Sequence, residues 1–233
     1  MSEPPKRRMV RPPTGGVARP SGERLKSGKF RTPSSRAWLE RQLADPFVVA
    51  AKARGYRSRA AFKLSEIDDR FHLIGRGARV IDLGCAPGGW LQVAVERGAG
   101  AVVGIDLLAV DPTPGATILL GDFTAEGCGA RLISALGAAP DLVLSDMAPN
   151  TVGHRRTDHL RIVALIEAAV EFSIASLKPG GALLTKAFQG GDTAEVAARL
   201  KAAFTDVKYV KPKASRAESS ELYLLARGLR ANG

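Results

Sequence analysis

The stretch that decides the fold is Val80-Ile81-Asp82-Leu83-Gly84-Cys85-Ala86-Pro87-Gly88-Gly89-Trp90. It joins a short apolar run to a glycine-rich turn and then to residues 91–96, which is the pattern of a buried strand that feeds a tight loop and a helix. The glycines leave room for a ligand to lie against the backbone, and the helix directs its free N–H groups toward that ligand. The stretch therefore predicts a loop that binds a ligand of nucleotide size, although such a turn can also serve topology alone.

The spacing within this turn argues against two common nucleotide-binding motifs. No Lys-Ser or Lys-Thr pair follows it, as the phosphate-binding loop of nucleotide hydrolases requires. Three residues separate Gly84 from Gly88, whereas the dinucleotide-binding motif has a single residue between its first two glycines. A nicotinamide-dependent dehydrogenase, which the fold class alone would allow, is therefore disfavoured.

Apolar runs and helical periodicities alternate along the chain. This alternation predicts an α/β fold with a doubly wound, mostly parallel sheet that helices cover on both faces. In the helix expected near residues 58–67, the periodicity places Leu64 at the edge of the core and Lys63 on or near an exposed face. The expected strands are 79–83, 101–105, 117–120, 142–144, 182–185, 207–210 and 222–226, and the expected helices are 35–55 with a break near Asp45-Pro46, 58–67, 91–96, 158–177 and 193–204.

Positive charge is concentrated at the N-terminus. The chain has 233 residues and a formal net charge of +11, and residues 1–36 contain ten Lys and Arg against two Glu, together with six of the fourteen prolines. Such a segment buries too little apolar surface to offset its ordering entropy. We expect a disordered basic arm over residues 1–34, a single domain over 35–228 and a tail over 229–233. The arm suits a polyanion such as nucleic acid, with a solubilising tail as the alternative.

Several classes of protein do not fit the composition. No apolar run approaches the roughly 20 residues that span a bilayer, and the N-terminus lacks the apolar core of a signal peptide. Two cysteines, Cys85 and Cys128, form no disulfide framework, and the three histidines show no metal-ligand spacing. We therefore expect a cytoplasmic protein without a membrane span or a metal site, and nothing suggests more than a monomer.

Acidic residues follow or end four of the expected strands: Asp82, Asp106, Asp122 and Asp146. Ligands of doubly wound sheets bind outside the carboxyl ends of the strands, and an acidic residue about 20 positions after the glycine turn accepts hydrogen bonds from ribose hydroxyls there. Asp106 occupies that position. Lys186 follows another strand at the same edge, and because a buried lysine needs a carboxylate partner, Asp146 is the candidate.

Four segments together carry a family resemblance. They are Asp82-Leu83-Gly84-Cys85-Ala86-Pro87-Gly88-Gly89-Trp90, Ser145-Asp146-Met147-Ala148-Pro149-Asn150, Lys186-Ala187-Phe188-Gln189-Gly190 and Ser215-Arg216-Ala217-Glu218-Ser219-Ser220-Glu221. From about residue 35 to residue 227 the chain resembles the FtsJ family of S-adenosylmethionine-dependent RNA ribose 2′-O-methyltransferases. It is most similar to the bacterial branch that modifies a uridine of large-subunit ribosomal RNA. The resemblance implies the Rossmann-like fold of class I S-adenosylmethionine-dependent methyltransferases; the arm has no counterpart in compact members.

The resemblance also assigns a catalytic tetrad: Lys63, Asp146, Lys186 and Glu221. Lys186 holds the position of the base or orienting group for the ribose hydroxyl. This assignment replaces the interpretation of Lys63 as a surface charge, which periodicity alone suggested.

Cofactor-binding residues follow from the same resemblance. Gly88 and Trp90 belong to the methionine side of an S-adenosyl-L-methionine site, Asp106 takes the cofactor ribose, and Asp122 takes the adenine amino group. Asp146 counts among the cofactor-binding residues as well. The one departure is Cys85, where relatives often carry alanine.

The implied substrate is RNA, because the accepting group is the 2′-hydroxyl that DNA lacks. Ribosomal RNA, within the large ribosomal subunit, is the expected partner. A transfer-RNA ribose methyltransferase of the same family and a non-catalytic RNA-binding protein on this fold are the alternatives. Basic residues that flank the tetrad segments are the expected contacts to the RNA backbone: Arg36, Arg57, Arg59, Lys211, Lys213 and Arg216.

Overall fold

The computed structural model describes residues 45–148, 153, 155–188, 194–216 and 219–231. The expected basic arm, Arg36 and the first part of the helix expected over residues 35–55 lie outside the described residues. The part of that helix after the expected break is α2, Pro46–Ala53. Asp45 caps it, since its Oδ1 accepts a hydrogen bond of 3.0 Å from the Phe47 N–H.

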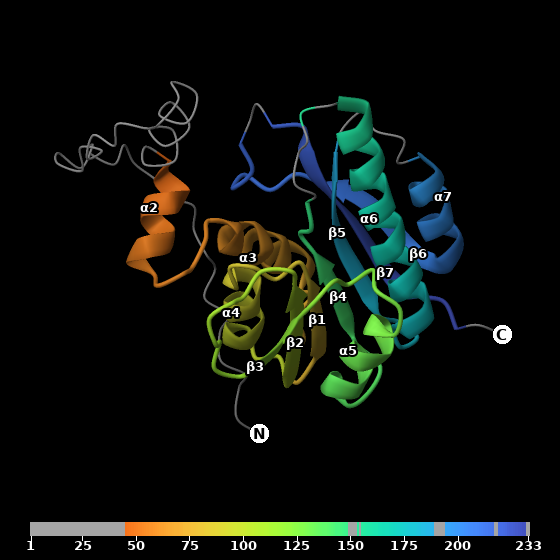
Figure 1. The fold of residues 1–233 in the computed structure, drawn as a ribbon, viewed down its shortest axis with the longest axis horizontal. Helices are drawn as coiled ribbons and strands as arrows, with labels where there is room; N and C mark the ends of the chain where they lie inside the picture. Colours follow the sequence, from red (N-terminus) through yellow and green to blue (C-terminus); the bar gives the residue numbers. More distant parts are fainter. Residues whose placement is uncertain (1–44, 149–152, 154, 189–193, 217–218, 232–233) are drawn as a thin grey trace.

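The centre of the molecule is a seven-stranded sheet in the order β3-β2-β1-β4-β5-β7-β6 (Figure 1). Only β7 among these strands runs against its neighbours, because β5 and β6 both pair with it in antiparallel register while the other pairs are parallel. The prediction of a doubly wound, mostly parallel sheet is confirmed. The strands are β1 Arg79–Leu83, β2 Ala101–Asp106, β3 Ala116–Leu120, β4 Leu142–Ser145, β5 Ala182–Phe188, β6 Phe204–Val210 and β7 Glu221–Leu229.

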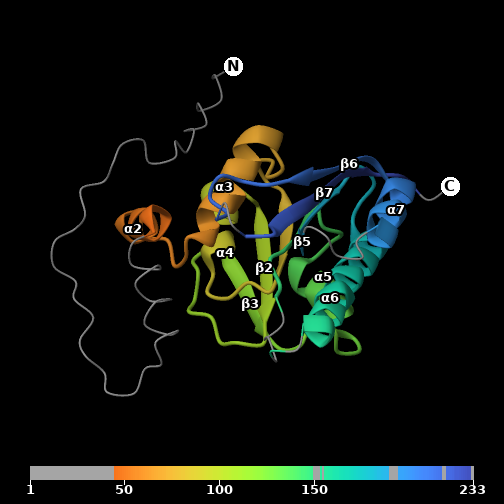
Figure 2. The same cartoon turned by 90° about the horizontal axis from the view of Figure 1, so that it is seen from above.

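Helices cover both faces of the sheet (Figures 1 and 2). On one face, α3 (Ala60–Phe71) and α4 (Gly89–Glu96) bury a core with Leu64, Leu91 and Leu144. On the other face, α5 (Cys128–Leu136), α6 (Arg155–Ser176) and α7 (Ala194–Ala203) bury a second core around Leu132 and Leu183. None of the described helices combines the length and apolarity needed to cross a lipid bilayer.

The sequence analysis did not predict helix α5, because its pattern of apolar residues is short. Cys128, Leu132 and Leu136 are buried and lie four residues apart, so they share one face, but the helix has only nine residues between two glycines. The expectation for Leu64 is wrong, because this side chain is fully buried between α3, α4 and the sheet rather than at the edge of the core. Lys63 is nearly buried too, so periodicity misplaced both neighbours on the helix.

Strands β5 and β7 are longer than the apolar runs that predict them. The antiparallel ladder continues through Lys186, which pairs with Tyr223, and through Phe188, which pairs with Glu221. Lys186 therefore lies within β5 and not after its end. Backbone pairing carries the strands past the point where the side chains cease to be apolar.

The strand order switches between β1 and β4: β2 and β3 are added on one side of β1, and the later strands are added on the other side, beginning with β4. The parallel strands β1 and β4 are therefore neighbours although about 60 residues separate them. The glycine turn after β1 and the segment after β4 approach each other here. A Cβ on Gly84 would lie 2.6 Å from Met147 Cγ, and Gly84 has φ +76°, so this position needs glycine on both counts. The switch point thus holds the glycine turn, with Gly88, and the segment that begins with Asp146.

Candidate active site

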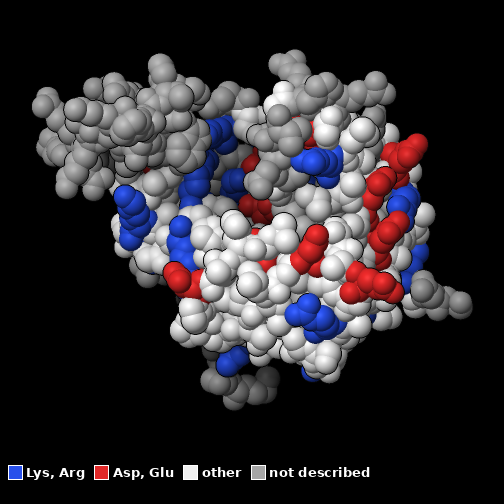
Figure 3. Space-filling model, viewed as in Figure 1, with Lys and Arg blue, Asp and Glu red and all other residues white. Residues whose placement is uncertain are grey.

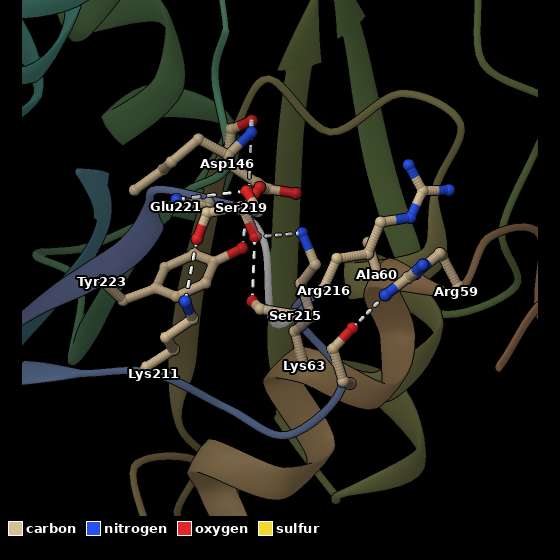
Figure 4. Close-up of polar contacts among 12 residues, drawn as sticks. Arg59, Ala60, Lys63, Asp146, Lys211, Ser215, Arg216, Ser219, Glu221 and Tyr223 are labelled. Atoms are coloured by element: carbon tan, nitrogen blue, oxygen red, sulfur yellow. Dashed lines mark hydrogen bonds and ion pairs between the residues drawn. The ribbon is translucent and has the colours of Figure 1, made fainter. Parts of the chain in front are cut away.

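Four elements deliver the expected tetrad to one place, and Figure 4 shows three of its members, Lys63, Asp146 and Glu221. Lys63 comes from α3, Asp146 directly follows β4, Lys186 lies on β5 and Glu221 begins β7. Because β4, β5 and β7 are adjacent in the sheet and β7 is reversed, the beginning of β7 meets the ends of β4 and β5. The structure brings all four side chains together as two ion pairs.

The first pair joins Lys63 to Glu221. The Lys63 ammonium lies 2.5 Å from Glu221 Oε1, and the two side chains are only 11% and 16% exposed. The Ser215 hydroxyl donates to the same oxygen at 3.0 Å. Burial raises the pKa of Glu221, but the charge and hydrogen bond of Lys63, the charge of Lys186 and the Ser215 hydroxyl outweigh it, so the pKa lies below its usual range. Glu221 is therefore a carboxylate at neutral pH.

The second pair joins Lys186 to Asp146. Lys186 Nζ lies 2.9 Å from Asp146 Oδ1 and donates a hydrogen bond of 2.8 Å to the main-chain oxygen of the same residue. An ammonium group has three donors, so two bonds to one residue fix its direction and leave a third donor. Lys186 is thus held in a defined orientation at the edge of the sheet.

Tyr223 connects the two pairs, and the sequence analysis missed it. Its hydroxyl donates to Asp146 Oδ1 at 2.8 Å, and its ring centroid lies 5.8 Å from the Lys63 ammonium. Burial, followed by the charges of Asp146 and Glu221, raises the pKa of Tyr223 well above its usual value, so the hydroxyl remains a donor. The signal was present, because residues two apart on a strand share a face and Tyr223 follows Glu221 by two.

Asp82 lies in β1, just before the glycine turn, and its carboxyl group has no hydrogen bond within the part of the chain that the structure describes. Asp82 is only 1% exposed. Burial, and then the charges of Asp146 and Asp106, raise the pKa of Asp82 well above its usual range. Burial and the two neighbouring carboxyl groups therefore disfavour the charged form of Asp82, and a cationic ligand beside it would offset that effect.

Asp106 and Asp122, the two other acids at strand ends, are held by backbone donors. Asp106 accepts hydrogen bonds from the Ala86 N–H at 2.8 Å and the Leu108 N–H at 2.9 Å. Asp122 Oδ1 accepts from the hydroxyl and the N–H of Thr124 at 2.7 and 2.8 Å. These two bonds hold the pKa of Asp122 below its usual range, and the bond from the Thr124 hydroxyl contributes more than the bond from the N–H. Both side chains are thus hydrogen-bond acceptors with a fixed orientation.

Exposed leucines lie beside these acceptors, and the sequence analysis did not single them out. Leu107 and Leu108 follow Asp106 directly, and Leu120 pairs with Asp106 in the β2–β3 ladder. All three rank among the most exposed large apolar side chains of the described residues. Apolar surface next to carboxylate acceptors suits a planar heterocycle with polar edges.

Gly88 and Trp90 occupy different environments. Gly88 has φ +106°, and a Cβ there would lie 2.5 Å from Arg57 Nη1, so the turn leaves no room for a side chain. The Trp90 indole is 3% exposed, donates to the Ala60 oxygen at 2.8 Å and packs against the Tyr223 ring. The side chain of Trp90 thus belongs to the core, and its main-chain N–H, in the first turn of α4, is the part available to a ligand.

The expected RNA-contacting residues fall into two groups. Arg57, Arg59 and Arg216 have internal partners: Arg57 the residue 111–113 segment, Arg59 the Asp45 carboxylate and the Ala214 oxygen, and Arg216 the Asp45 carboxylate at 3.6 Å. Lys211 and Lys213 are exposed. Figure 3 shows Lys and Arg side chains around a hollow with acidic side chains inside it. The described chain contains no cluster of three or more His, Cys, Asp or Glu able to hold a metal ion.

Comparison with known proteins agrees with this geometry. Residues 56–229 match the FtsJ-like methyltransferase family. The chain belongs to the FtsJ family. Relatives named ribosomal RNA large subunit methyltransferase E include one from Caulobacter vibrioides, 62% identical over 95% of this chain and 99% of its own length, and one from Granulibacter bethesdensis, 56% identical over 96% of each.

A solved FtsJ-like fold extends the comparison to structure. A ribosomal RNA methyltransferase from Plasmodium falciparum superposes with a TM-score of 0.68 and 29% identity over 76% of this chain and all of its own. The predicted family and the predicted Rossmann-like methyltransferase fold are both confirmed.

Proposed function

We propose that this FtsJ-family methyltransferase uses S-adenosyl-L-methionine to methylate a ribose 2′-hydroxyl, that of a uridine in 23S ribosomal RNA of the large subunit. The relatives named for large-subunit ribosomal RNA support the substrate class. The observation that carries the proposal is the tetrad, in which two lysine–carboxylate pairs meet around Tyr223. Such a site binds and orients one hydroxyl next to a second ligand.

The residues at the glycine turn fit the cofactor. S-adenosyl-L-methionine carries positive charge on its sulfonium and on its amino group, which suits the unpaired carboxyl of Asp82 and the nearby Asp146 and Asp106. Gly88 would offer its main chain to the methionine part, Asp106 would hold the ribose, and Asp122 with the exposed leucines would hold the adenine. When bound, the cofactor supplies a methyl group on a good leaving group, so alignment of the hydroxyl is the main task left to the protein.

Lys186 is the residue assigned to that alignment. Two contacts with Asp146 fix the direction of its Nζ, so the remaining N–H donates to the hydroxyl oxygen and directs it toward the methyl carbon. The hydroxyl proton then passes to Asp146 or to water as the new C–O bond forms. Tyr223 and Lys63 hold Asp146 and Glu221 in place and keep the charges of the site balanced.

A direct assay tests the proposed function. Purified protein is incubated with tritiated S-adenosyl-L-methionine and, in separate reactions, with large ribosomal subunits, free 23S ribosomal RNA and transfer RNA from a strain that lacks the enzyme. We expect label in ribosomal RNA at one ribose, located by digestion and mass spectrometry. Label in transfer RNA alone, or no label in any RNA, would contradict the proposal.

A further inference from the structure

Arg57 makes an unusual set of contacts for a residue expected to bind RNA. Its Nη1 donates to the Asp111 oxygen at 2.7 Å, to the Thr113 hydroxyl at 2.8 Å and to the Pro87 oxygen at 3.4 Å. Its Nη2 donates to the Pro112 oxygen at 2.7 Å. The guanidinium therefore faces four oxygen acceptors of the protein itself, and an RNA phosphate would have to displace them.

These acceptors lie on the two segments that frame the cofactor side of the site. Pro87 belongs to the glycine turn, and Arg57 Nη1 also lies where a Cβ of Gly88 would be. The other three acceptors belong to the loop that follows Asp106 and leads from β2 to β3. Asp106 joins the same two segments by accepting from the N–H groups of Ala86 and Leu108.

The main chain of Arg57 is also held in place. Its main-chain N–H donates to Gln92 Oε1 at 2.9 Å, and Gln92 Nε2 donates to the Gly55 oxygen at 2.9 Å. Gln92 lies in α4, the helix that the glycine turn opens. Arg57 is thus anchored to the helix behind the turn while its guanidinium reaches the loop on the far side of it.

We propose that Arg57 is a positioning residue that sets the separation between the glycine turn and the β2–β3 loop, and thereby the affinity for the cofactor. The inference rests on the proposed function. Lysine cannot replace arginine in this role, because a point charge with three donors does not reproduce a planar fork that reaches four acceptors on two segments. As a contact to RNA phosphate, in contrast, lysine would serve nearly as well.

The Arg57→Lys variant separates the two roles. We expect the Kd for S-adenosylhomocysteine, measured by calorimetry on the full chain without RNA, to rise about tenfold or more, since charged hydrogen bonds are lost. The KM for S-adenosyl-L-methionine should rise with it, while kcat at saturating cofactor stays within about twofold because Lys186 is untouched. RNA affinity and its salt dependence should not change. Arg76→Lys, at an exposed arginine before β1, is the matched control and should leave every quantity at the wild-type value.

Two further measurements keep the test decisive. Thr113→Val removes one acceptor of Arg57 with little change of shape and should weaken cofactor binding in the same direction by roughly twofold to tenfold, which also serves if the Arg57 variant folds poorly. An unchanged cofactor Kd in both variants, or a loss confined to RNA affinity with a shallower salt dependence, would overturn the inference. Absence of methyl transfer by the wild-type protein would count against the proposed function. The role of Arg57 is decided by a separate readout, because the calorimetric Kd is measured without RNA.

Discussion

The two halves of the site treat their charges differently. On the tetrad side, Lys63 meets Glu221 and Lys186 meets Asp146, so each buried charge has an opposite charge from a distant part of the chain. On the cofactor side, Asp106 is held only by backbone N–H groups and Asp82 has no hydrogen-bond partner among the described residues. The tetrad is electrically complete without a ligand, whereas the cofactor side carries an excess of acid that a cation would balance.

Under the proposed function, this difference would allow one site to hold two ligands of different kinds. A neutral ribose hydroxyl needs fixed donors and acceptors, which paired charges supply without a net field. A sulfonium cofactor gains from unbalanced carboxyl groups, and its neutral product gains less from them. Under the proposed function, the asymmetry would therefore favour binding of the methyl donor over the demethylated product at the same place.

The largest effect is expected on the rate of methyl transfer when Lys186 is removed from the tetrad. Lys186→Ala should lower the rate of methyl transfer by roughly 10²–10⁴ while the Kd for the cofactor stays nearly unchanged, because the partner proposed for Lys186 is the ribose hydroxyl and not the cofactor. Single-turnover assays at saturating RNA measure this rate. Lys178→Ala, at a lysine that pairs with Asp141 away from the site, is the control and should keep full activity. A Lys186 variant with more than about a tenth of the wild-type rate would make this lysine a structural ion-pair partner.

The next largest effect is expected on cofactor affinity when Asp106 is replaced. Asp106→Ala removes the acceptor proposed for the cofactor ribose and the link between the Ala86 and Leu108 N–H groups. Cofactor affinity should fall about tenfold to a hundredfold, the value of a charge-assisted hydrogen bond. Calorimetric titration checks it, with Asp206→Ala on the edge strand β6 as control. Equal affinities for mutant and wild type would remove Asp106 from the cofactor site.

A third prediction concerns the unpaired acid. Because the pKa of Asp82 is raised in the folded state, the unfolded chain loses this proton first as pH rises, so the free energy of unfolding should fall above about pH 4 by up to about 1.4 kcal/mol per unit, until the folded-state pKa is passed. Asp82→Asn should flatten this dependence. Urea titrations of the ligand-free protein between pH 4 and 8 measure it. Parallel curves for the two proteins would show that Asp82 is not the group responsible.

The smallest effect tests the link within the tetrad. Tyr223→Phe keeps the ring against Trp90 and removes the hydroxyl that donates to Asp146, so the rate should fall about threefold to tenfold with cofactor affinity unchanged. Steady-state kinetics at saturating RNA checks this. A loss as large as that of Lys186→Ala would mean that the hydroxyl itself contacts the reacting group.

Sequence predicted the sheet because its strands are continuous apolar runs, and it predicted the tetrad through family resemblance. Periodicity alone put Lys63 at the surface, because a helix pattern cannot reveal that Glu221, 158 residues away, approaches it. The internal contacts of Arg57 could not be predicted from the sequence for a related reason: most of its partners are main-chain oxygens of the 111–113 segment, and a main-chain oxygen is present whatever the residue type. Helix α5 was missed because three buried residues are too few to establish a period.

The reversal of β7 has a practical consequence for anyone who handles this protein. Glu221 opens the strand at the catalytic edge, and the chain then runs away from it, so that Leu229 pairs with Phe204 and accepts a hydrogen bond from the Gly180 N–H at the opposite edge. Eight residue steps along a strand span about 26 Å. A fluorescent protein or surface anchor fused after residue 231 would therefore leave the domain on the side remote from the pocket, and single-molecule or immobilised assays can use that end without obstructing RNA.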